Sequence, residues 1–225
     1  MPLLPVFLPH CYSTDPTCFS LQEVNWQNVL LDQFFAEYPH HELRISDAGE
    51  TGLTEYCDGT WEPVVCDGEK VTQVRLSNAS SGQFRIHKLP PTLEELMITL
   101  SHQFSTVDTR KLPRKLVVAL LDFNQYFGRL DLTTLPPAME RACFRSNNFK
   151  GPITLCHLPP TLVELELQWN KISQHVVWYD NLPANIKTIQ LQAKNHRKIR
   201  EVRSVHPYSL ADKAIFPNIP VKRVH

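Results

Sequence analysis

Apolar residues recur along most of this chain with a spacing of 23 or 24 residues. Each unit opens with a Leu-Pro pair, and the leucines are Leu89, Leu112, Leu135, Leu158 and Leu182. After each leucine, apolar side chains return at the fourth, seventh and ninth positions. The alternation around the last two positions predicts a short β-strand, with apolar side chains in a core and the intervening side chains on a surface. The sequence therefore predicts a repeat protein in which each unit adds one strand to a parallel sheet.

A helix is predicted ahead of the repeats. Ser20 and Glu23 form a capping box at its start, and Pro39 ends it. Apart from Asn28, one face of this helix is apolar. The apolar residues are Leu21, Val24, Leu31, Phe35 and Tyr38. We expect this face to pack against the first repeat.

The repeat unit is clearest at residues 158–172, LPPTLVELELQWNKI. It reads L-P-P-x-L-x-x-L-x-L-x-x-N-x-I and resembles the leucine-rich repeat. Its LPPTLxxL opening is similar to the repeats of protozoan surface proteins of this class. The resemblance implies an α/β fold, a right-handed leucine-rich repeat solenoid shaped as a short horseshoe. It also implies a parallel β-sheet on the concave face and an N-terminal capping helix.

A cysteine loop precedes the repeats. Cys57, Trp61, Val64 and Cys66, followed by the V-x-x-V-x-L of an irregular first repeat, resemble the N-terminal cap of plant-receptor-type leucine-rich repeat proteins. Pro63 departs from that family, which has glycine there. The resemblance implies a Cys57–Cys66 disulfide, and closing so short a loop would contribute about 2–3 kcal/mol. The alternative is two reduced, buried cysteines beside a core tryptophan.

An asparagine follows the strand in three of the repeats: Asn124, Asn147 and Asn170. We expect each amide to satisfy backbone groups at the bend after its strand. Ser101 and Lys194 stand at the same position in the outer repeats, which are irregular as terminal repeats tend to be. Gly128 and Gly151 complete the N-x-L-x-G-x-I pattern of the plant-type class, in which the glycine permits a turn into a second short strand.

The side chains between the core leucines define the predicted concave face, and part of it is apolar. Aromatic and arginine side chains among polar ones are typical of protein interfaces. The alternative is an unselected surface, since isolated exposed apolar residues are common. The candidate binding residues are Met97, Val118, Leu120, Asp122, Phe123, Arg141, Arg145, Glu164, Glu166, Gln168 and Trp169.

The sequence offers little support for catalysis. It has no nucleotide-binding loop, no nucleophile elbow and no H-E-x-x-H zinc motif. His40 and His41 have too few partners at suitable spacing for a metal site, and we expect Cys143 and Cys156 to be free thiols. We therefore expect no catalytic residue, no metal, no cofactor and no small-molecule substrate.

Charge is uneven along the chain, although the net charge is zero. Residues 1–70 carry 2 basic and 12 acidic residues, residues 71–193 carry 13 and 9, and residues 194–225 carry 8 and 2. The expected organisation is an N-terminal tail or signal remnant (1–19), a cap (20–70), the leucine-rich repeats (71–193) and a basic C-terminal cap or tail (194–225). The basic segment is expected either to seal the end of the solenoid or to face an acidic partner.

The function that these features favour is protein–protein recognition through the concave face. The family resemblance favours a secreted or cell-surface protein, and Asn78-Ala79-Ser80 is an N-glycosylation sequence that matters only on that route. The alternative is an intracellular scaffold that docks through the basic end. Nucleic acid is an unlikely partner because the pI is near 7.1 and RNA-binding motifs are absent. No apolar run is long enough to span a membrane.

Overall fold

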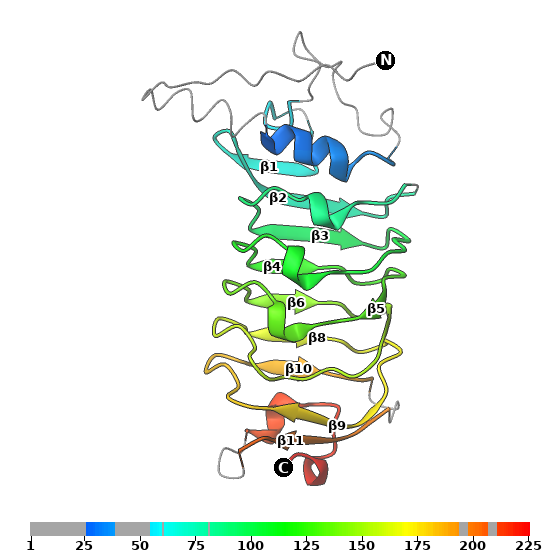
Figure 1. The fold of residues 1–225 in the computed structure, drawn as a ribbon, viewed down its shortest axis with the longest axis vertical. Coiled ribbons are helices and arrows are strands. Elements are labelled where there is room, and N and C mark those ends of the chain that lie inside the picture. The colour runs from blue at the N-terminus through cyan, green and yellow to red at the C-terminus, as the bar shows by residue number, and fades with distance from the viewer. Residues whose placement is uncertain (1–25, 39–54, 60, 81, 194–197, 207–210) are drawn as a thin grey trace, which may run out of the picture.

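A computed structural model describes residues 26–38, 55–59, 61–80, 82–193, 198–206 and 211–225. These residues form a parallel-strand solenoid of about six turns, with a helix at its N-terminal end (Figure 1). Several predictions fall outside the described residues: the tail, the helix start at Ser20, and the residues His40 and His41. No helix within the described ranges is long and apolar enough to cross a membrane.

The main sheet runs the length of the solenoid. Its strands, in spatial order, are β1 (Val64–Asp67), β2 (Lys70–Ser77), β3 (Glu95–Thr99), β4 (Val118–Leu120), β6 (Arg141–Cys143), β8 (Glu164–Glu166) and β10 (Thr188–Gln190). Only β1 is antiparallel to its neighbour. From β3 to β10 the aligned residues are 23, 23, 23 and 24 positions apart, beginning with Glu95 opposite Val118. The predicted repeat spacing is therefore the strand register of the sheet.

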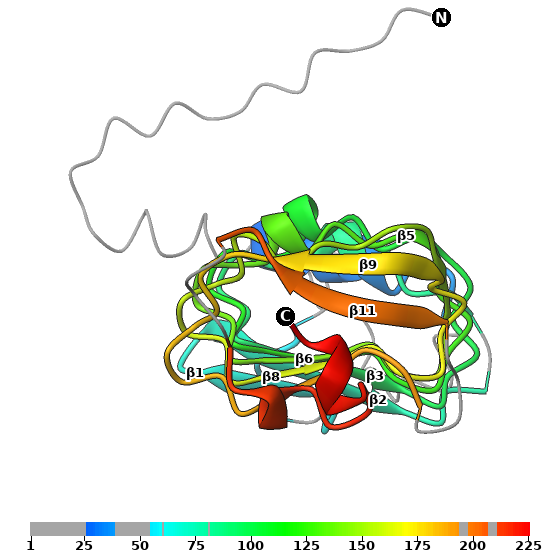
Figure 2. The same cartoon turned by 90° about the horizontal axis from the view of Figure 1, so that it is seen from below.

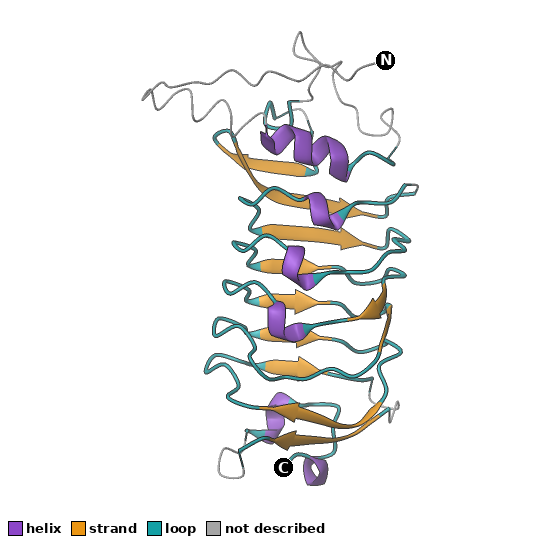
Figure 3. Ribbon diagram, in the orientation of Figure 1, coloured by secondary structure: helices purple, strands orange, loops and turns teal. Residues whose placement is uncertain are grey.

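The opposite side of the solenoid is built from two-stranded sheets and 3₁₀ helices (Figures 2 and 3). Strands β5 (Phe127–Arg129) and β7 (Asn148–Lys150) pair in parallel, as do β9 (Gln174–Tyr179) and β11 (Ile199–Ser204). The 3₁₀ helices η2 (Ile86–Lys88), η3 (Thr109–Lys111) and η4 (Leu132–Thr134) come directly before Leu-Pro pairs. The second short strand occurs where the glycines predicted it, and Gly128 and Gly151 have φ of 92° and 81°.

The core lies between these two sides and is filled by the periodic apolar residues. Leu93, Leu96 and Ile98 of the first regular repeat are fully buried. The proline of each Leu-Pro pair shapes the approach to the strand, because its carbonyl accepts a hydrogen bond from the amide three residues later. Leu93 N to Pro90 O, at 3.2 Å, is the first of five such bonds. The last repeat is looser, since Ile186 is only partly buried.

The predicted asparagines link neighbouring turns. Asn147 Nδ2 donates to the carbonyls of Leu121, Phe144 and Arg145, while its Oδ1 accepts from Tyr126 N at 3.0 Å. Asn124 and Asn170 make equivalent bonds. All three side chains are buried. Buried backbone groups need partners, and this asparagine ladder supplies them at each bend.

The N-terminal helix spans residues 26–34 and packs on the first turns as predicted. Leu31 and Phe35 are buried, but so is Phe34, which the predicted apolar stripe omitted. Phe34 stacks on Phe84 with ring centroids 5.4 Å apart, and this contact widens the buried face. Gln27 is also buried; its Oε1 accepts from Val71 N at 2.7 Å and fastens the helix to β2.

The cysteine loop closes beneath this helix. Cys57 and Cys66 form a disulfide, as the cap resemblance implied. Trp61 and Tyr56 are buried beside it, and both rings contact Phe35, at centroid distances of 4.6 and 5.9 Å. The cysteine loop is thus joined to the helix through an aromatic cluster of Phe35, Tyr56 and Trp61.

The C-terminal segment covers the other end of the core. Phe216, Ile219 and Val224 are buried, and 3₁₀ helices η5 (Lys213–Ile215) and η6 (Val221–Arg223) carry exposed lysines outward. Tyr179 Oη accepts from Ala211 N and donates to the His225 carbonyl. Residues 211–225 therefore place apolar side chains against this end of the core, and an acidic partner for the basic segment stays a prediction.

Candidate binding surface

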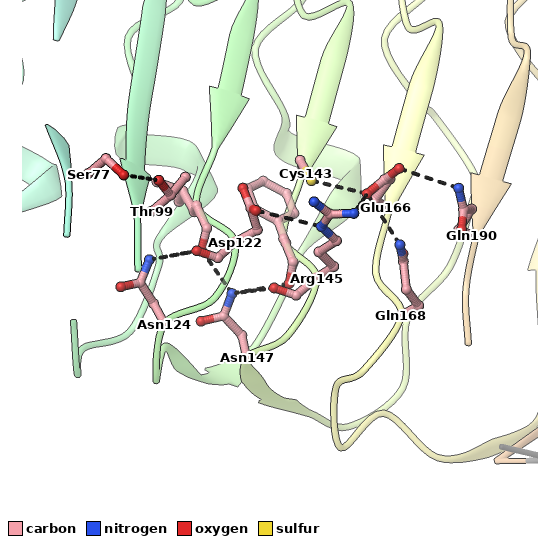
Figure 4. A network of polar contacts seen from close by, with 12 residues as sticks. Ser77, Thr99, Asp122, Asn124, Cys143, Arg145, Asn147, Glu166, Gln168 and Gln190 are labelled. Atoms are coloured by element: carbon pink, nitrogen blue, oxygen red, sulfur yellow. Dashed lines mark hydrogen bonds and ion pairs between the residues drawn. The ribbon is translucent and has the colours of Figure 1, made fainter. Parts of the chain in front are cut away.

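The side chains of the main sheet alternate between the core and the outside, so one side chain in two from each strand lies on the sheet face, the side of the main sheet that points away from the core (Figure 4). Met97, Val118 and Leu120 are half-buried there, and Arg141 is exposed. The 23-residue register places these predicted binding residues on consecutive strands. The structure thus brings residues far apart in sequence onto one continuous surface.

A hollow of about 440 Å³ lies in the sheet face across β3, β4, β6 and β8. Apolar side chains line it at the β3 and β4 end, and charged ones at the β6 and β8 end. Seven of the eleven predicted binding residues line it. They are Met97, Leu120, Asp122, Arg141, Arg145, Glu164 and Glu166.

Arg145 is the centre of the charged network at this hollow. Its guanidinium lies 3.6 Å from a carboxylate oxygen of Asp122 and 3.6 Å from one of Glu166. It also lies over the Phe123 ring, 5.0 Å from the ring centroid. Asp122 and Glu166 are 8% and 9% exposed. Both carboxylates nevertheless line the hollow, on either side of Arg145.

Glu166 joins three strands. Its Oε2 accepts from Cys143 Sγ at 3.2 Å and from Gln168 Nε2 at 3.2 Å, and its Oε1 accepts from Gln190 Nε2 at 3.3 Å (Figure 4). Gln168, a predicted binding residue, is buried in this network, and its own Oε1 has no hydrogen-bond partner in the described part of the chain.

Cys143 is a poor nucleophile in this setting. Burial raises the pKa of its thiol most, and the hydrogen bond to Glu166 and the charges of Asp122 and Glu166 raise it further. The thiolate is the reactive form of cysteine, and the environment keeps this thiol protonated. Cys143 and Cys156 are both free, as predicted.

The remaining charges on the sheet face pair across strands. Arg75 forks onto Glu95 at 2.9 and 3.1 Å, which raises the pKa of the arginine, and Arg141 Nε lies 3.1 Å from Glu164. Exposed pairs of this kind contribute at most about 1 kcal/mol. Because each pair joins one positive and one negative side chain, the sheet face has no large patch of a single charge here.

Along one edge of the sheet face, the residue before the ladder position is in the left-handed region in five consecutive turns, from β2 to β8. Leu100, Phe123 and Trp169 have φ of 52°, 55° and 63°, and their side chains are 51%, 45% and 56% exposed. We call these three residues the apolar ridge. Ser146 interrupts it, with φ of 53°. Asn78 holds the same position in the first turn, with φ of 58°.

The sequence placed Phe123 and Trp169 on this surface but gave no sign of their backbone geometry. The one available signal was Asn78, because asparagine is enriched at positive φ and here marks the position in the first turn. Three of the predicted binding residues, Asp122, Glu166 and Gln168, are largely buried, although Asp122 and Glu166 still line the hollow. Within the described residues, no group of three or more His, Cys, Asp or Glu side chains is arranged to hold a metal ion.

No family model matches this chain, and no curated protein matches it. Among solved structures, it is similar to the crystal structure of a pollen receptor kinase 3, with a TM-score of 0.56 and 17% sequence identity. The likeness covers 80% of this chain and 94% of that chain. At this level of identity the likeness concerns the fold: a parallel-strand solenoid with one helix at its N-terminal end, consistent with a leucine-rich-repeat-like architecture.

Proposed function

We propose that this chain is a non-catalytic recognition module that binds a protein partner through the sheet face and the apolar ridge. The observation that carries the proposal is the ridge itself. Leu100, Phe123 and Trp169 expose large apolar side chains from a backbone conformation that bulky residues rarely adopt. The solenoid supplies a rigid platform, which reduces the ordering that binding requires.

The backbone strain at the ridge favours a functional role for its exposed apolar side chains. A left-handed conformation costs a residue with a Cβ about 1–2 kcal/mol, and asparagine or glycine would reduce that cost. Asn78 shows that this chain can use asparagine at the position. Three large apolar residues there combine strain with exposed apolar surface, and strained residues cluster at functional sites.

We infer that Ser146, a small residue, leaves a notch between two ridge residues. Neighbouring strands lie about 4.8 Å apart, so Phe123 and Trp169, two turns apart, are separated by about 10 Å along the solenoid. That distance admits one apolar side chain of a partner above Ser146. The Arg145 network and the hollow adjoin the notch, and they offer hydrogen bonds around that anchor.

Substitution of the ridge residues, with the exposed Trp178 as a control, tests this surface. Partners are first selected with the wild-type chain from a displayed library of protein domains. Trp169→Ser and Phe123→Ser should each abolish capture of the selected partners, and Ser146→Leu, which fills the notch, should weaken it. Trp178→Ser is the control, because Trp178 is 46% exposed on β9, across the core from the sheet face. Equal loss with Trp178→Ser, or capture unchanged by all three ridge variants, would place the binding site elsewhere.

We further propose that the protein acts outside the cell or at its surface. The Cys57–Cys66 disulfide supports this proposal, because disulfides persist mainly in oxidising compartments. Alkylation of natively expressed protein without reduction, followed by peptide mass spectrometry, tests it. A crosslinked Cys57–Cys66 peptide is the expected result. Two alkylated thiols would favour the intracellular scaffold that docks through its basic end.

A further inference from the structure

The chain contains one N-glycosylation sequence in its 225 residues, Asn78-Ala79-Ser80. It lies directly after β2, at the turn that leaves the main sheet. Such a sequence is used only where the asparagine side chain reaches solvent and the folded protein tolerates a bulky, hydrophilic group. The structure of this turn decides both points.

Main-chain bonds and a buried alanine hold the turn in place. Asn78 N donates to the Thr99 carbonyl at 3.0 Å, and Ala79 N donates to Ser101 Oγ at 3.1 Å. Ala79 is buried, whereas Asn78 and Ser80 are exposed. The turn therefore keeps its shape through its backbone and directs the asparagine side chain outward.

The Asn78 amide has no structural task comparable with that of the other turn asparagines. Asn124, Asn147 and Asn170 occupy the ladder position and are buried in hydrogen bonds. In the first turn Ala79 has the ladder position, and Asn78 lies one residue earlier. Among the described residues, the Asn78 side-chain amide makes no hydrogen bond. A sugar on this nitrogen would displace no contact of the fold.

We propose that Asn78 is an N-glycosylation site. In the reaction, Asn78 Nδ2 loses one proton and forms a bond to C1 of the first sugar. The C1–O bond of a lipid-linked oligosaccharide diphosphate breaks, and the lipid diphosphate leaves. The donor is supplied by the secretory pathway, so this proposal rests on the proposed location outside the cell, which the Cys57–Cys66 disulfide supports.

The test is expression behind a secretion signal in cultured eukaryotic cells, with secreted and cell-retained protein analysed together. The wild-type chain should migrate more slowly, and peptide N-glycosidase F should reverse the shift and convert Asn78 to Asp in the peptide mass spectrum. Ser80→Thr keeps the acceptor sequence and should keep the shift. Asn78→Gly and Ser80→Ala should both remove it, and the glycine retains the left-handed turn.

Two outcomes would overturn the proposal. The first is a chain that has formed the Cys57–Cys66 disulfide, and has therefore entered the oxidising lumen, with an unmodified Asn78. The second is a shift that persists in Asn78→Gly, which would place the sugar on another residue. Because Asn78→Gly is compatible with the turn, loss of its shift cannot be attributed to misfolding when its disulfide is intact.

Discussion

The thiol of Cys143 on β6 donates to Glu166 Oε2 on β8 across 3.2 Å, and the same carboxylate lies 3.6 Å from Arg145. The contact ties together the two strands at the charged end of the hollow. Because burial and this neighbouring carboxylate raise the pKa of the thiol, Cys143 belongs to the support of the surface and is not a reactive group.

Alkylation kinetics should show this protection. At mildly alkaline pH, iodoacetamide should label Cys143 slowly, since little thiolate forms. Glu166→Gln removes the carboxylate charge and should speed labelling several-fold, while burial still keeps the rate below that of a free thiol in an unfolded peptide. Peptide mass spectrometry over time measures the rate. Fast labelling of Cys143 in the wild-type chain would contradict the hydrogen bond.

Tyr126 should be replaceable by phenylalanine with a gain in stability. Its hydroxyl is buried and has no hydrogen-bond partner in the described residues, so Tyr126→Phe should raise the free energy of unfolding by about 1 kcal/mol. Tyr179→Phe is the matched control, because that hydroxyl makes two hydrogen bonds and its loss should destabilise by about 1–2 kcal/mol. Urea denaturation compares the two, and opposite signs are the expected result.

Tyr126 should also make the free energy of unfolding depend on pH above about pH 10. Burial raises the pKa of Tyr126 well above its ordinary value of about 10. Below pH 10 both folded and unfolded states hold the proton. Above it only the unfolded state ionises, so stability falls as pH rises. Tyr126→Phe should make this decline shallower between pH 10 and 11. An identical slope in the variant would show that the hydroxyl ionises in the folded protein.

Asn147 should be far more important to stability than its neighbour Asn148. Asn147→Ala leaves the buried Tyr126 amide without its partner and removes one of the hydrogen bonds to each of three carbonyls, and should destabilise by about 2–4 kcal/mol. The Asn148 side chain is only partly buried, so Asn148→Ala should change stability by about 0.5 kcal/mol or less. Thermal or urea unfolding measures both. Similar values for the two variants would refute the ladder.

Relief of backbone strain should stabilise the ridge at the expense of binding. Leu100→Asn places a residue suited to positive φ at a strained position, and should raise the free energy of unfolding by about 1 kcal/mol. Asn78→Leu makes the reverse change and should lower it by a similar amount. Both effects are measured by denaturation, and Leu100→Asn should also weaken capture of partners selected by the wild-type chain. A destabilised Leu100→Asn would mean that side-chain packing outweighs strain there.

Much of the solenoid was predictable because its determinants are local and repeated. The Leu-Pro spacing set the register from β3 to β10, and Asn124, Asn147 and Asn170 have the expected bonds. The disulfide followed from the resemblance of one short segment to a known cap. Handedness and the curvature of the sheet remain expectations from that resemblance.

The details of the candidate site were not predictable because they depend on contacts between turns. Alternation indicated that Asp122 and Glu166 face outward, but both are largely buried, and both contact Arg145, which follows the strand β6 of the turn between them. The left-handed conformation of Leu100 likewise follows from the bend that directs the next residue inward, where Ser101 N bonds to Asn124 of the following turn. Neither effect leaves a trace in composition or periodicity.

Each strand of the main sheet pairs only with the strands of the adjacent turns, so the turns are linked in series. A force along the solenoid axis would act equally on every interface between turns, and unfolding would begin at the less stable end. A covalent bond and an aromatic cluster close the N-terminal end, whereas hydrogen bonds and a few apolar side chains hold residues 211–225. Under tension, the solenoid would unfold one turn at a time from its C-terminal end.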